Sequence, residues 1–353
     1  MAARIRWTDM DKSNIPFAKL RAGFVVYNQT TGKSKATIGW YDWRLGLFER
    51  WLGPDAKLAD VTIPTVRQYV ADLQGRTMRC VDNPFINKGK GKPGTLSSAY
   101  IHSFVRALRA FASWLREDGY TEENRLRNLK PPKLQRKVVE PLSDEEVARL
   151  VSVFELSDGF GARDFAIVWT LLDCGLRASE LCNLTVENAH LEQGYLKVLG
   201  KGNKERLVPI GQRCQETLVR WRDRFRPHFE VAPCPYLFLN ANGEGLALDA
   251  LERVVDAAGR RSGVTRVYCH LLRHTFATNY LVKQVGDPLR LQQILGHTSL
   301  EMVRRYVAAA NVQQSLIERR ASPMDLIARD GRPSTQRRRV QPRRMRRGLK
   351  LVK

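Results

Sequence analysis

The chain has 353 residues and a formal net charge of +23 at pH 7, since 59 Lys and Arg outnumber 36 Asp and Glu. This length exceeds the roughly 250–300 residues at which one hydrophobic core stops growing, so we expect two domains. No apolar run approaches the ~18 residues of a membrane span, and the polar N-terminus lacks the apolar segment of an export signal. Membrane and secreted classes are therefore disfavoured, and the expected location is the cytoplasm.

The first domain is predicted to be helical. We expect residues 1–17 to be a flexible N-terminus and residues 18–132 to form the domain. Apolar residues recur at three- and four-residue intervals from Lys35 until Gly53-Pro54 ends the run, and two further helices are predicted at 63–73 and 96–117. A basic loop with interleaved glycines lies between the last two helices and contains Lys88, Lys90 and Lys92.

The helix predicted at 96–117 has two distinct faces. One face is an apolar stripe, and the other carries His102, Arg106, Arg109 and Arg116 at helical spacing. Contact with nucleic acid phosphates and a simple solvated surface both explain this basic face. We therefore treat these four residues, together with the three loop lysines, as candidate DNA-binding residues.

A linker at 133–139 is expected to lead into a second domain at 140–328. Ser143 and Glu146 form a capping box at its first helix. Two strands, 195–199 and 206–210, flank turn residues typical of a hairpin. Helices are predicted at 163–173, 212–225, 247–260, 271–283, 288–295 and 300–310. The tail at 329–353 is too polar to form a core.

The positive charge is unevenly distributed along the chain. Residues 1–139 have a net charge of +13, residues 140–328 are neutral, and residues 329–353 carry +10. Two basic zones that flank a neutral block predict a polyanionic partner, and nucleic acid is the first candidate. A generally basic soluble protein is the alternative.

The cysteines do not form a recognisable metal motif. There are six, with no CxxC pair and no histidine at zinc-ligand spacing: Cys80, Cys174, Cys182, Cys214, Cys234 and Cys269. We interpret them as small, mostly buried residues in a reducing compartment. His270 and His274 are four residues apart, but no HExxH pattern and no third ligand accompany them.

Four short segments of the second domain carry chemically distinctive residues. They are Cys174-Gly-Leu-Arg-Ala-Ser-Glu-Leu181, Gly200-Lys-Gly-Asn-Lys-Glu-Arg206, His270-Leu-Leu-Arg-His274, and Gly296-His297 followed nine residues later by Tyr306. In this order they resemble the tyrosine recombinase (phage integrase) family, whose pattern is Arg, Lys, His-x-x-Arg, His and Tyr. The resemblance covers about residues 18–320. It implies a mainly α fold with a small β-sheet, in which a helical core-binding domain precedes a mixed α/β catalytic domain.

The residue types themselves suit phosphodiester chemistry. A phosphodiester is anionic, so a nucleophile attacks it only where positive charge neutralises the non-bridging oxygens. Arg177 and Arg273 each offer a planar, permanently charged fork that matches phosphate geometry. His270 lies three residues before Arg273, so one helix face presents both side chains to a common site.

The resemblance assigns further roles. It implies that Tyr306 is the nucleophile of a covalent 3′-phosphotyrosyl intermediate, that His270 assists proton transfer, and that His297 donates a hydrogen bond to the phosphate. It also implies that Lys201 is the general acid that protonates the 5′-oxygen, although Lys204 in the same turn is an alternative. We expect Glu180 to orient Arg177 and His274 to be a packing residue. No GxxxxGK[ST] loop occurs, and we expect no metal or other cofactor.

The predicted function is that of a site-specific DNA recombinase that integrates, excises or transposes a mobile element. A chromosome-dimer-resolving Xer-type recombinase, a type IB topoisomerase-like enzyme and a catalytically idle DNA-binding protein are the alternatives. The expected partner is double-stranded DNA, on which the chain acts as a tetramer although it is a monomer when free. We expect a prokaryotic host and association with the nucleoid. Residues 312–327 are a candidate intersubunit helix, and packing on their own domain is the alternative.

Overall fold

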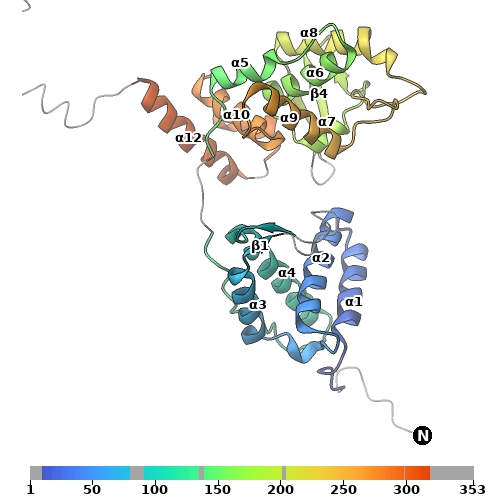
Figure 1. The fold of residues 1–353 in the computed structure, drawn as a ribbon, viewed down its shortest axis with the longest axis vertical. Coiled ribbons are helices and arrows are strands. Elements are labelled where there is room, and N and C mark those ends of the chain that lie inside the picture. Colours follow the sequence, from blue (N-terminus) through green and yellow to red (C-terminus); the bar gives the residue numbers. More distant parts are fainter. Residues whose placement is uncertain (1–9, 80–90, 135–138, 201–203, 298, 319–353) are drawn as a thin grey trace, which may run out of the picture. The chain divides into compact units, whose positions relative to one another are not determined.

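The computed structural model describes residues 10–79, 91–134, 139–200, 204–297 and 299–318. The chain divides into two compact units, Met1–Val138 and Val139–Lys353, and the division falls within the residues expected to form a linker. Figure 1 shows helices as the dominant elements of both units, with small antiparallel sheets. The predicted fold class, mainly α with a small β-sheet, is confirmed. Among the described residues, no helix is both long and apolar enough to cross a membrane.

The first unit is a helical bundle with a short two-stranded ribbon. Its elements are α1 (Phe17–Thr30), α2 (Lys35–Leu52), a 3₁₀ turn (Leu58–Asp60), α3 (Ile63–Gly75), β1 (Met78–Arg79), β2 (Lys92–Pro93) and α4 (Ser98–Glu117). The three predicted helices correspond to α2, α3 and α4. Buried aromatic rings from α1, α2 and α4 form much of the core; Phe17, for example, packs against Phe48 and Phe111 with ring centroids 5.7 and 5.2 Å apart.

The expectation of a flexible segment at 1–17 is wrong for its last residues. The backbone oxygens of Ser13 and Ile15 accept hydrogen bonds from Ala59 and Leu58, and Phe17 is completely buried. Phe17 also begins α1, a helix that the sequence analysis did not predict. The first-turn signal is weak there, because Pro16 precedes the helix without a side-chain cap.

The second unit consists of helices around a three-stranded antiparallel sheet. Its elements are α5 (Asp144–Ser152), α6 (Gly159–Cys174), α7 (Ala178–Cys182), β3 (Ala189–His190), β4 (Tyr195–Leu199), β5 (Glu205–Pro209), α8 (Gln212–Arg220), α9 (Leu248–Ser262), α10 (Cys269–Val282), α11 (Pro288–Leu295) and α12 (Leu300–Glu318). The capping box of Ser143 and Glu146 is present at α5. The sheet has the order β3-β4-β5, with Lys197 opposite Leu207.

Several elements differ from the prediction, and the short helix α7 is an element that was not predicted. The helix expected at 212–225 ends as an α-helix at Arg220 and continues as a π-helical turn, Trp221–Phe225. Strand β3 was not predicted, because two residues are too few for a recognisable alternation. Helix α12 runs to Glu318, so the start of the segment at 312–327 continues that helix, and the segment beyond 318 lies outside the described residues.

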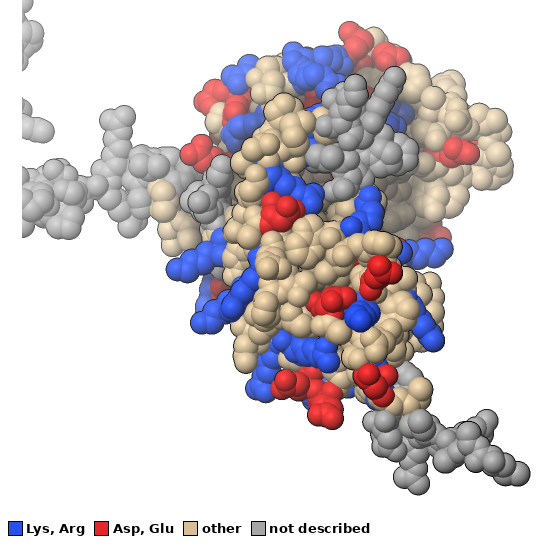
Figure 2. Space-filling model, turned by 60° about the horizontal axis from the view of Figure 1, so that its bottom comes forward, with Lys and Arg blue, Asp and Glu red and all other residues tan. Residues whose placement is uncertain are grey.

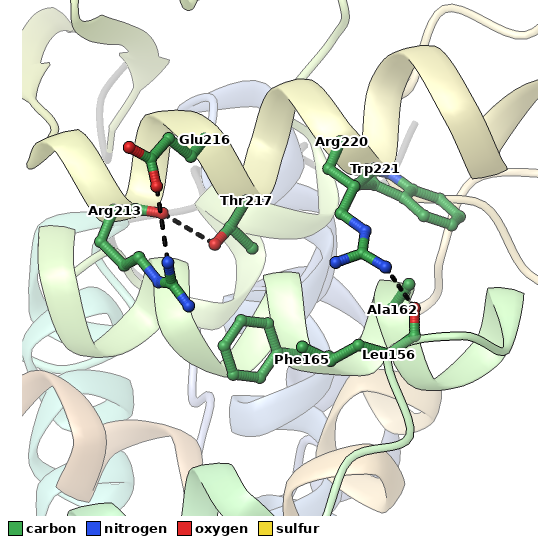
Figure 3. Close-up of a pocket in the computed structure, with 8 residues that line it drawn as sticks. All are labelled: Leu156, Ala162, Phe165, Arg213, Glu216, Thr217, Arg220 and Trp221. Carbon is green, nitrogen blue, oxygen red and sulfur yellow. Dashed lines mark hydrogen bonds and ion pairs between the residues drawn. The ribbon is translucent and has the colours of Figure 1, made fainter.

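Helix α6 is the centre of the second core. Its buried residues include Ala166, Ile167, Val168 and Leu171, and it packs against both α8 and α10. On the α8 side, a pocket of about 160 Å³ has aromatic walls and the side chains of Arg213 and Arg220 at its rim (Figure 3). Arg220 closes one end by donating to the backbone oxygen of Leu156 at 2.9 Å. This pocket contains none of the residues predicted to be catalytic.

Candidate active site

The turn after α6 places Arg177 at the site. Gly175 ends the helix in the left-handed conformation, with φ +58°, and a Cβ there would lie 2.2 Å from Cδ1 of Phe276. Only glycine fits this close approach without strain. The chain then reverses, so that Arg177 precedes the first turn of α7 with its guanidinium partly exposed.

Glu180 fixes the position of Arg177 through two hydrogen bonds. Its carboxylate accepts the backbone N–H of Arg177 at 2.9 Å and Nη1 of Arg177 at 2.6 Å, which is the contact that the sequence predicted. A second arginine that the sequence analysis missed, Arg206, donates to both carboxylate oxygens at 2.8 and 2.7 Å. Burial alone would raise the pKa of Glu180, but hydrogen bonds from Arg206 and Arg177 outweigh it and lower the pKa to about 2. The carboxylate is therefore ionised at neutral pH.

The position of Arg206 in the strand pattern indicates that its side chain is partly buried. The alternation of β5 places Val208, which is buried, and Arg206 on the same face of the strand. An arginine in an inward-facing position of a strand requires a partner, since an unpaired buried charge is costly. The partner, Glu180, lies 26 residues earlier in the chain, so only the tertiary structure identifies it.

Arg273 is fixed on α10 and faces the same region. It is only 2% exposed, and it donates to the backbone oxygens of Gly175 and Leu295 at 2.6 and 2.8 Å. Burial, followed by the charge of Arg177, lowers the pKa of Arg273 to about 10, which still leaves it protonated at neutral pH. Glu180 pairs with Arg177 and Arg206, whereas the donors of Arg273 go to backbone oxygens and to His297. Two more carboxylates, Glu252 and Asp256, line the adjoining cleft.

His297 lies in the turn after α11. Nη2 of Arg273 is 3.0 Å from its Nε2 atom, and because arginine only donates, Nε2 accepts and the ring proton is assigned to Nδ1. Nδ1 is buried and has no hydrogen-bond partner among the described residues. Burial, reinforced by the charges of Arg273 and Arg177, lowers the pKa of His297 to about 4. The imidazole is therefore neutral, and its buried Nδ1–H is a donor without an acceptor among the described residues.

Tyr306 is the buried aromatic residue of this cluster. It lies on α12, which packs against α10, and its ring stacks on His297 with centroids 6.1 Å apart and an interplanar angle of 9°. The ring of His274 is 5.3 Å away on another side, and Nε2 of His274 donates to the backbone oxygen of Val139 at 2.6 Å. Burial raises the pKa of Tyr306, although the nearby arginines oppose this effect. The phenol therefore needs help to lose its proton.

A cleft opens next to these residues. It has a volume of about 590 Å³, and its lining includes Arg177, His270 and Arg273. His270 is exposed there, and burial of part of its ring, together with the charge of Arg273, lowers its pKa. The structure thus brings together five of the six predicted catalytic residues. The sixth, Lys201, lies outside the described residues, and Lys204 is exposed.

Four of the seven candidate DNA-binding residues lie on α4. Arg106, Arg109 and Arg116 of α4 are exposed, His102 is partly exposed, and Lys92 is exposed in β2, whereas Lys88 and Lys90 lie outside the described residues. Arg44 of α2, which is not among these candidates, contacts α4 because its Nε donates to Ser103 at 2.9 Å, and its guanidinium lies 4.1 Å from the ring centroid of Trp40. On the face of the molecule seen in Figure 2, Lys and Arg side chains are interspersed with acidic ones.

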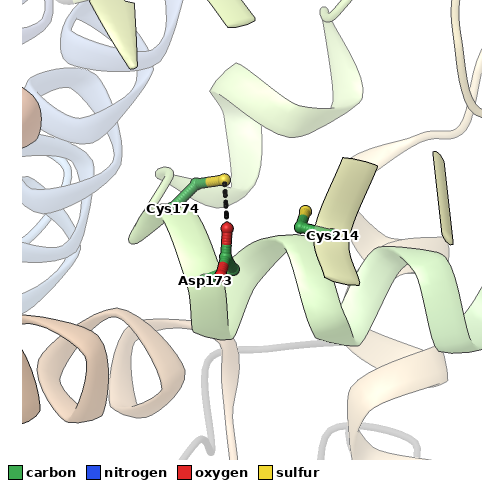
Figure 4. Close-up of side chains that lie close together, drawn as sticks. All are labelled: Asp173, Cys174 and Cys214. Carbon is green, nitrogen blue, oxygen red and sulfur yellow. Dashed lines mark hydrogen bonds between the residues drawn. The ribbon is translucent and has the colours of Figure 1, made fainter. Parts of the chain in front are cut away.

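One group of potential metal ligands occurs in the described part of the chain. Asp173, Cys174 and Cys214 have ligand atoms within 4.8 Å of one another where α6 meets α8 (Figure 4). A hydrogen bond with Cys214 and burial raise the pKa of Cys174. Asp173 accepts the backbone N–H of Gly211 at 2.8 Å. These hydrogen bonds join the end of α6 to the start of α8.

Arg177, His270 and Arg273 line this cleft, and His297 and Tyr306 are connected to them through the contact of Arg273 with His297 and the stacking of Tyr306 on His297. Comparison with known proteins identifies the family. Residues 140–312 match the phage integrase family model. The tyrosine recombinase XerC of Staphylococcus carnosus is 34% identical over 62% of this chain and 74% of its own, and the XerD of Neisseria meningitidis serogroup A is 28% identical over 70% and 88%.

A solved structure has the same fold. The crystal structure of the XerH site-specific recombinase, bound to difH substrate in a pre-cleavage complex, aligns with a TM-score of 0.59 at 22% identity, over 82% of this chain and 81% of that one. The chain belongs to the tyrosine recombinase (phage integrase) family. The predicted family and enzyme class are confirmed, and the protein is a site-specific tyrosine recombinase.

Proposed function

We propose that the chain cuts and rejoins double-stranded DNA through a covalent 3′-phosphotyrosyl link to Tyr306. The observation that carries this proposal is the convergence of Arg177 and Arg273, each fixed by its own partners, on the cleft that His270 lines. These two guanidinium groups neutralise the non-bridging oxygens of a phosphodiester, and they need little reorganisation because they are already held.

The cleavage step follows from the groups present. The Tyr306 oxygen attacks phosphorus, the new P–O bond forms, and the bond to the 5′-oxygen breaks. His270 takes up the phenol proton, while Lys201 gives a proton to the departing 5′-oxygen. Neutral His297 donates from Nδ1 to a phosphate oxygen once its ring is reoriented beside the substrate. The phosphotyrosyl bond conserves the free energy of the broken ester, so rejoining requires no nucleotide.

The first unit supplies a binding surface for DNA. The exposed arginines of α4 contact phosphates, and Arg44 with its aromatic neighbours extends this surface onto α2. We propose a tetramer of four chains on two DNA sites, formed from monomers, in the cytoplasm and at the nucleoid of a prokaryotic host. Integration, excision or transposition of a mobile element is the proposed role. Resolution of chromosome dimers is the second candidate, favoured by the similarity to XerC and XerD.

Covalent trapping tests the proposal. A duplex nicked near the cleavage position releases a short fragment after attack, so the phosphotyrosyl adduct accumulates and is visible on a denaturing gel. Wild type should give this adduct and Tyr306→Phe should not, although the variant binds the same duplex. An adduct in the variant would reject Tyr306 as the nucleophile. Mapping the cleavage position on the DNA adjoining the gene in its host distinguishes the ends of a mobile element from a chromosomal site.

A further inference from the structure

Arg206 is a nearly buried arginine that the mechanism above does not use. Its side chain is 11% exposed, and it donates to three acceptors: both oxygens of Glu180 and, from Nε, the backbone oxygen of Ile294 at 2.7 Å. One guanidinium on β5 therefore links the sheet to the start of α7 and to the end of α11.

Two glycines allow the chain to approach Arg206 closely. A Cβ at Gly200 would lie 3.2 Å from Nη1 of Arg206 and 3.5 Å from Oε1 of Glu180, and a Cβ at Gly296 would lie 3.1 Å from Cδ of Arg206. Gly200 immediately precedes Lys201 in the sequence, and Gly296 immediately precedes His297. The backbone oxygen of Gly296 also accepts Nη2 of Arg177 at 3.3 Å. The segments that lead to Lys201, Arg177 and His297 thus all contact the Arg206–Glu180 pair.

We infer that Arg206 is a positioning residue, which holds Gly200, the residue after β4, and Gly296 against the Arg206–Glu180 pair. Because Lys201 follows Gly200 in the sequence, we expect the loss of Arg206 to impair the general acid. This inference rests on the proposed role of Lys201. A lysine at position 206 would keep the charge but not the planar fork that spans two carboxylate oxygens and one backbone carbonyl. Charge alone is therefore insufficient at this position.

Cleavage of two matched substrates tests the inference. One is the nicked duplex, and the other carries sulfur in place of the bridging 5′-oxygen, so that the leaving group departs without a proton. Misplacing a catalytic group by about 1 Å costs about 10²-fold in rate, and we expect a loss of this size for Arg206→Gln on the oxygen substrate. For Arg206→Gln, the sulfur substrate should restore a large part of the lost rate. On the oxygen substrate, Arg206→Lys should be faster than Arg206→Gln but slower than wild type. Arg222→Gln, which removes an arginine paired with Glu192, should cleave both substrates like wild type.

Amide hydrogen exchange supplies a second readout that does not depend on Lys201. Arg206→Gln should accelerate exchange at the Gly200 N–H, which donates to the Lys204 oxygen, and at the Arg177 N–H, which donates to Glu180. Gly200→Ala introduces a methyl group beside an intact Arg206 and should accelerate exchange at the same two amides to a smaller extent. This variant replaces Arg206→Gln if the latter does not fold.

The outcomes separate the two proposals. Wild-type cleavage by Arg206→Gln would overturn the positioning role. So would a slow variant that the sulfur substrate does not help and whose Gly200 and Arg177 amides exchange as in wild type. If Lys201→Ala is itself not helped by sulfur, Lys201 is not the acid; slow cleavage with faster exchange in Arg206→Gln then still supports Arg206 as the residue that orders the site.

Discussion

Nη2 of Arg273 lies 3.0 Å from Nε2 of His297, and both side chains are buried. The contact determines which ring nitrogen carries the proton, and the positive charge of Arg273 opposes a second proton on the ring. His297 is therefore neutral, with its proton on Nδ1, before any substrate arrives. The folding stability of the second unit should therefore depend on pH in the acid range.

Stability should fall as the pH drops from 6.5 towards 4. Burial lowers the pKa of His297 from 6.5 to about 4, so the unfolded chain binds this proton first, and stability that is fully present above pH 6.5 is lost as the pH falls through that window. The full effect is about 3 kcal/mol. Denaturant unfolding of the catalytic unit between pH 7 and pH 4 measures it. His297→Asn should flatten this part of the profile, and an unchanged slope in the variant would contradict the buried neutral ring.

Lys201→Ala should be rescued by a 5′-bridging phosphorothiolate. The thiolate leaves without a proton, so the general acid becomes unnecessary, whereas Arg177→Ala should not recover because its role is to neutralise the non-bridging oxygens. Single-turnover cleavage of the oxygen and sulfur substrates gives the two ratios. Lys204→Ala is the matched control for the other lysine of the turn. Equal rescue of both the Lys201 and Arg177 variants, or of neither, would remove Lys201 from the acid role.

Arg109→Ala should weaken DNA binding equally on all sequences. The side chain is exposed on α4, and one lost phosphate contact should reduce the slope of log affinity against log salt by about 1. A salt titration on one half-site and on an unrelated duplex measures both effects. Arg67→Ala, an exposed arginine on α3, is the comparison variant. If Arg109→Ala binds like wild type at every salt concentration, the basic face of α4 is only solvated.

Deleting residues 329–353 should weaken DNA affinity in a salt-dependent manner and leave cleavage intact. The segment holds 11 basic residues, of which only some contact DNA, so the salt slope should become shallower by a few units, at about 0.9 for each phosphate contact. If the tail binds a neighbouring chain instead, pairing of two sites is lost while affinity for a single site is unchanged. Loss of adduct formation on a single site would contradict both hypotheses, that the tail binds DNA and that it binds a neighbouring chain.

The sequence by itself determined the domain with the catalytic motifs, most helices and the hairpin, because hydrophobic periodicity, caps and turn residues are local signals. The capping box of Ser143 and Glu146 and the contact of Glu180 with Arg177 are of this kind, since each joins residues three positions apart. The family pattern predicted the candidate catalytic residues in the same way, from short motifs and their order.

Only the tertiary structure decided the partners of buried charges and the state of the buried rings. Arg206 contacts Glu180 across 26 residues and Ile294 across 88, and the pKa of His297, in the turn after α11, depends on Arg273, 24 residues earlier on α10. Helix α1 likewise depends on Phe17 entering a core formed by Phe48 and Phe111. Desolvation and long-range pairing arise only when distant segments pack together, so no local pattern in the sequence records them.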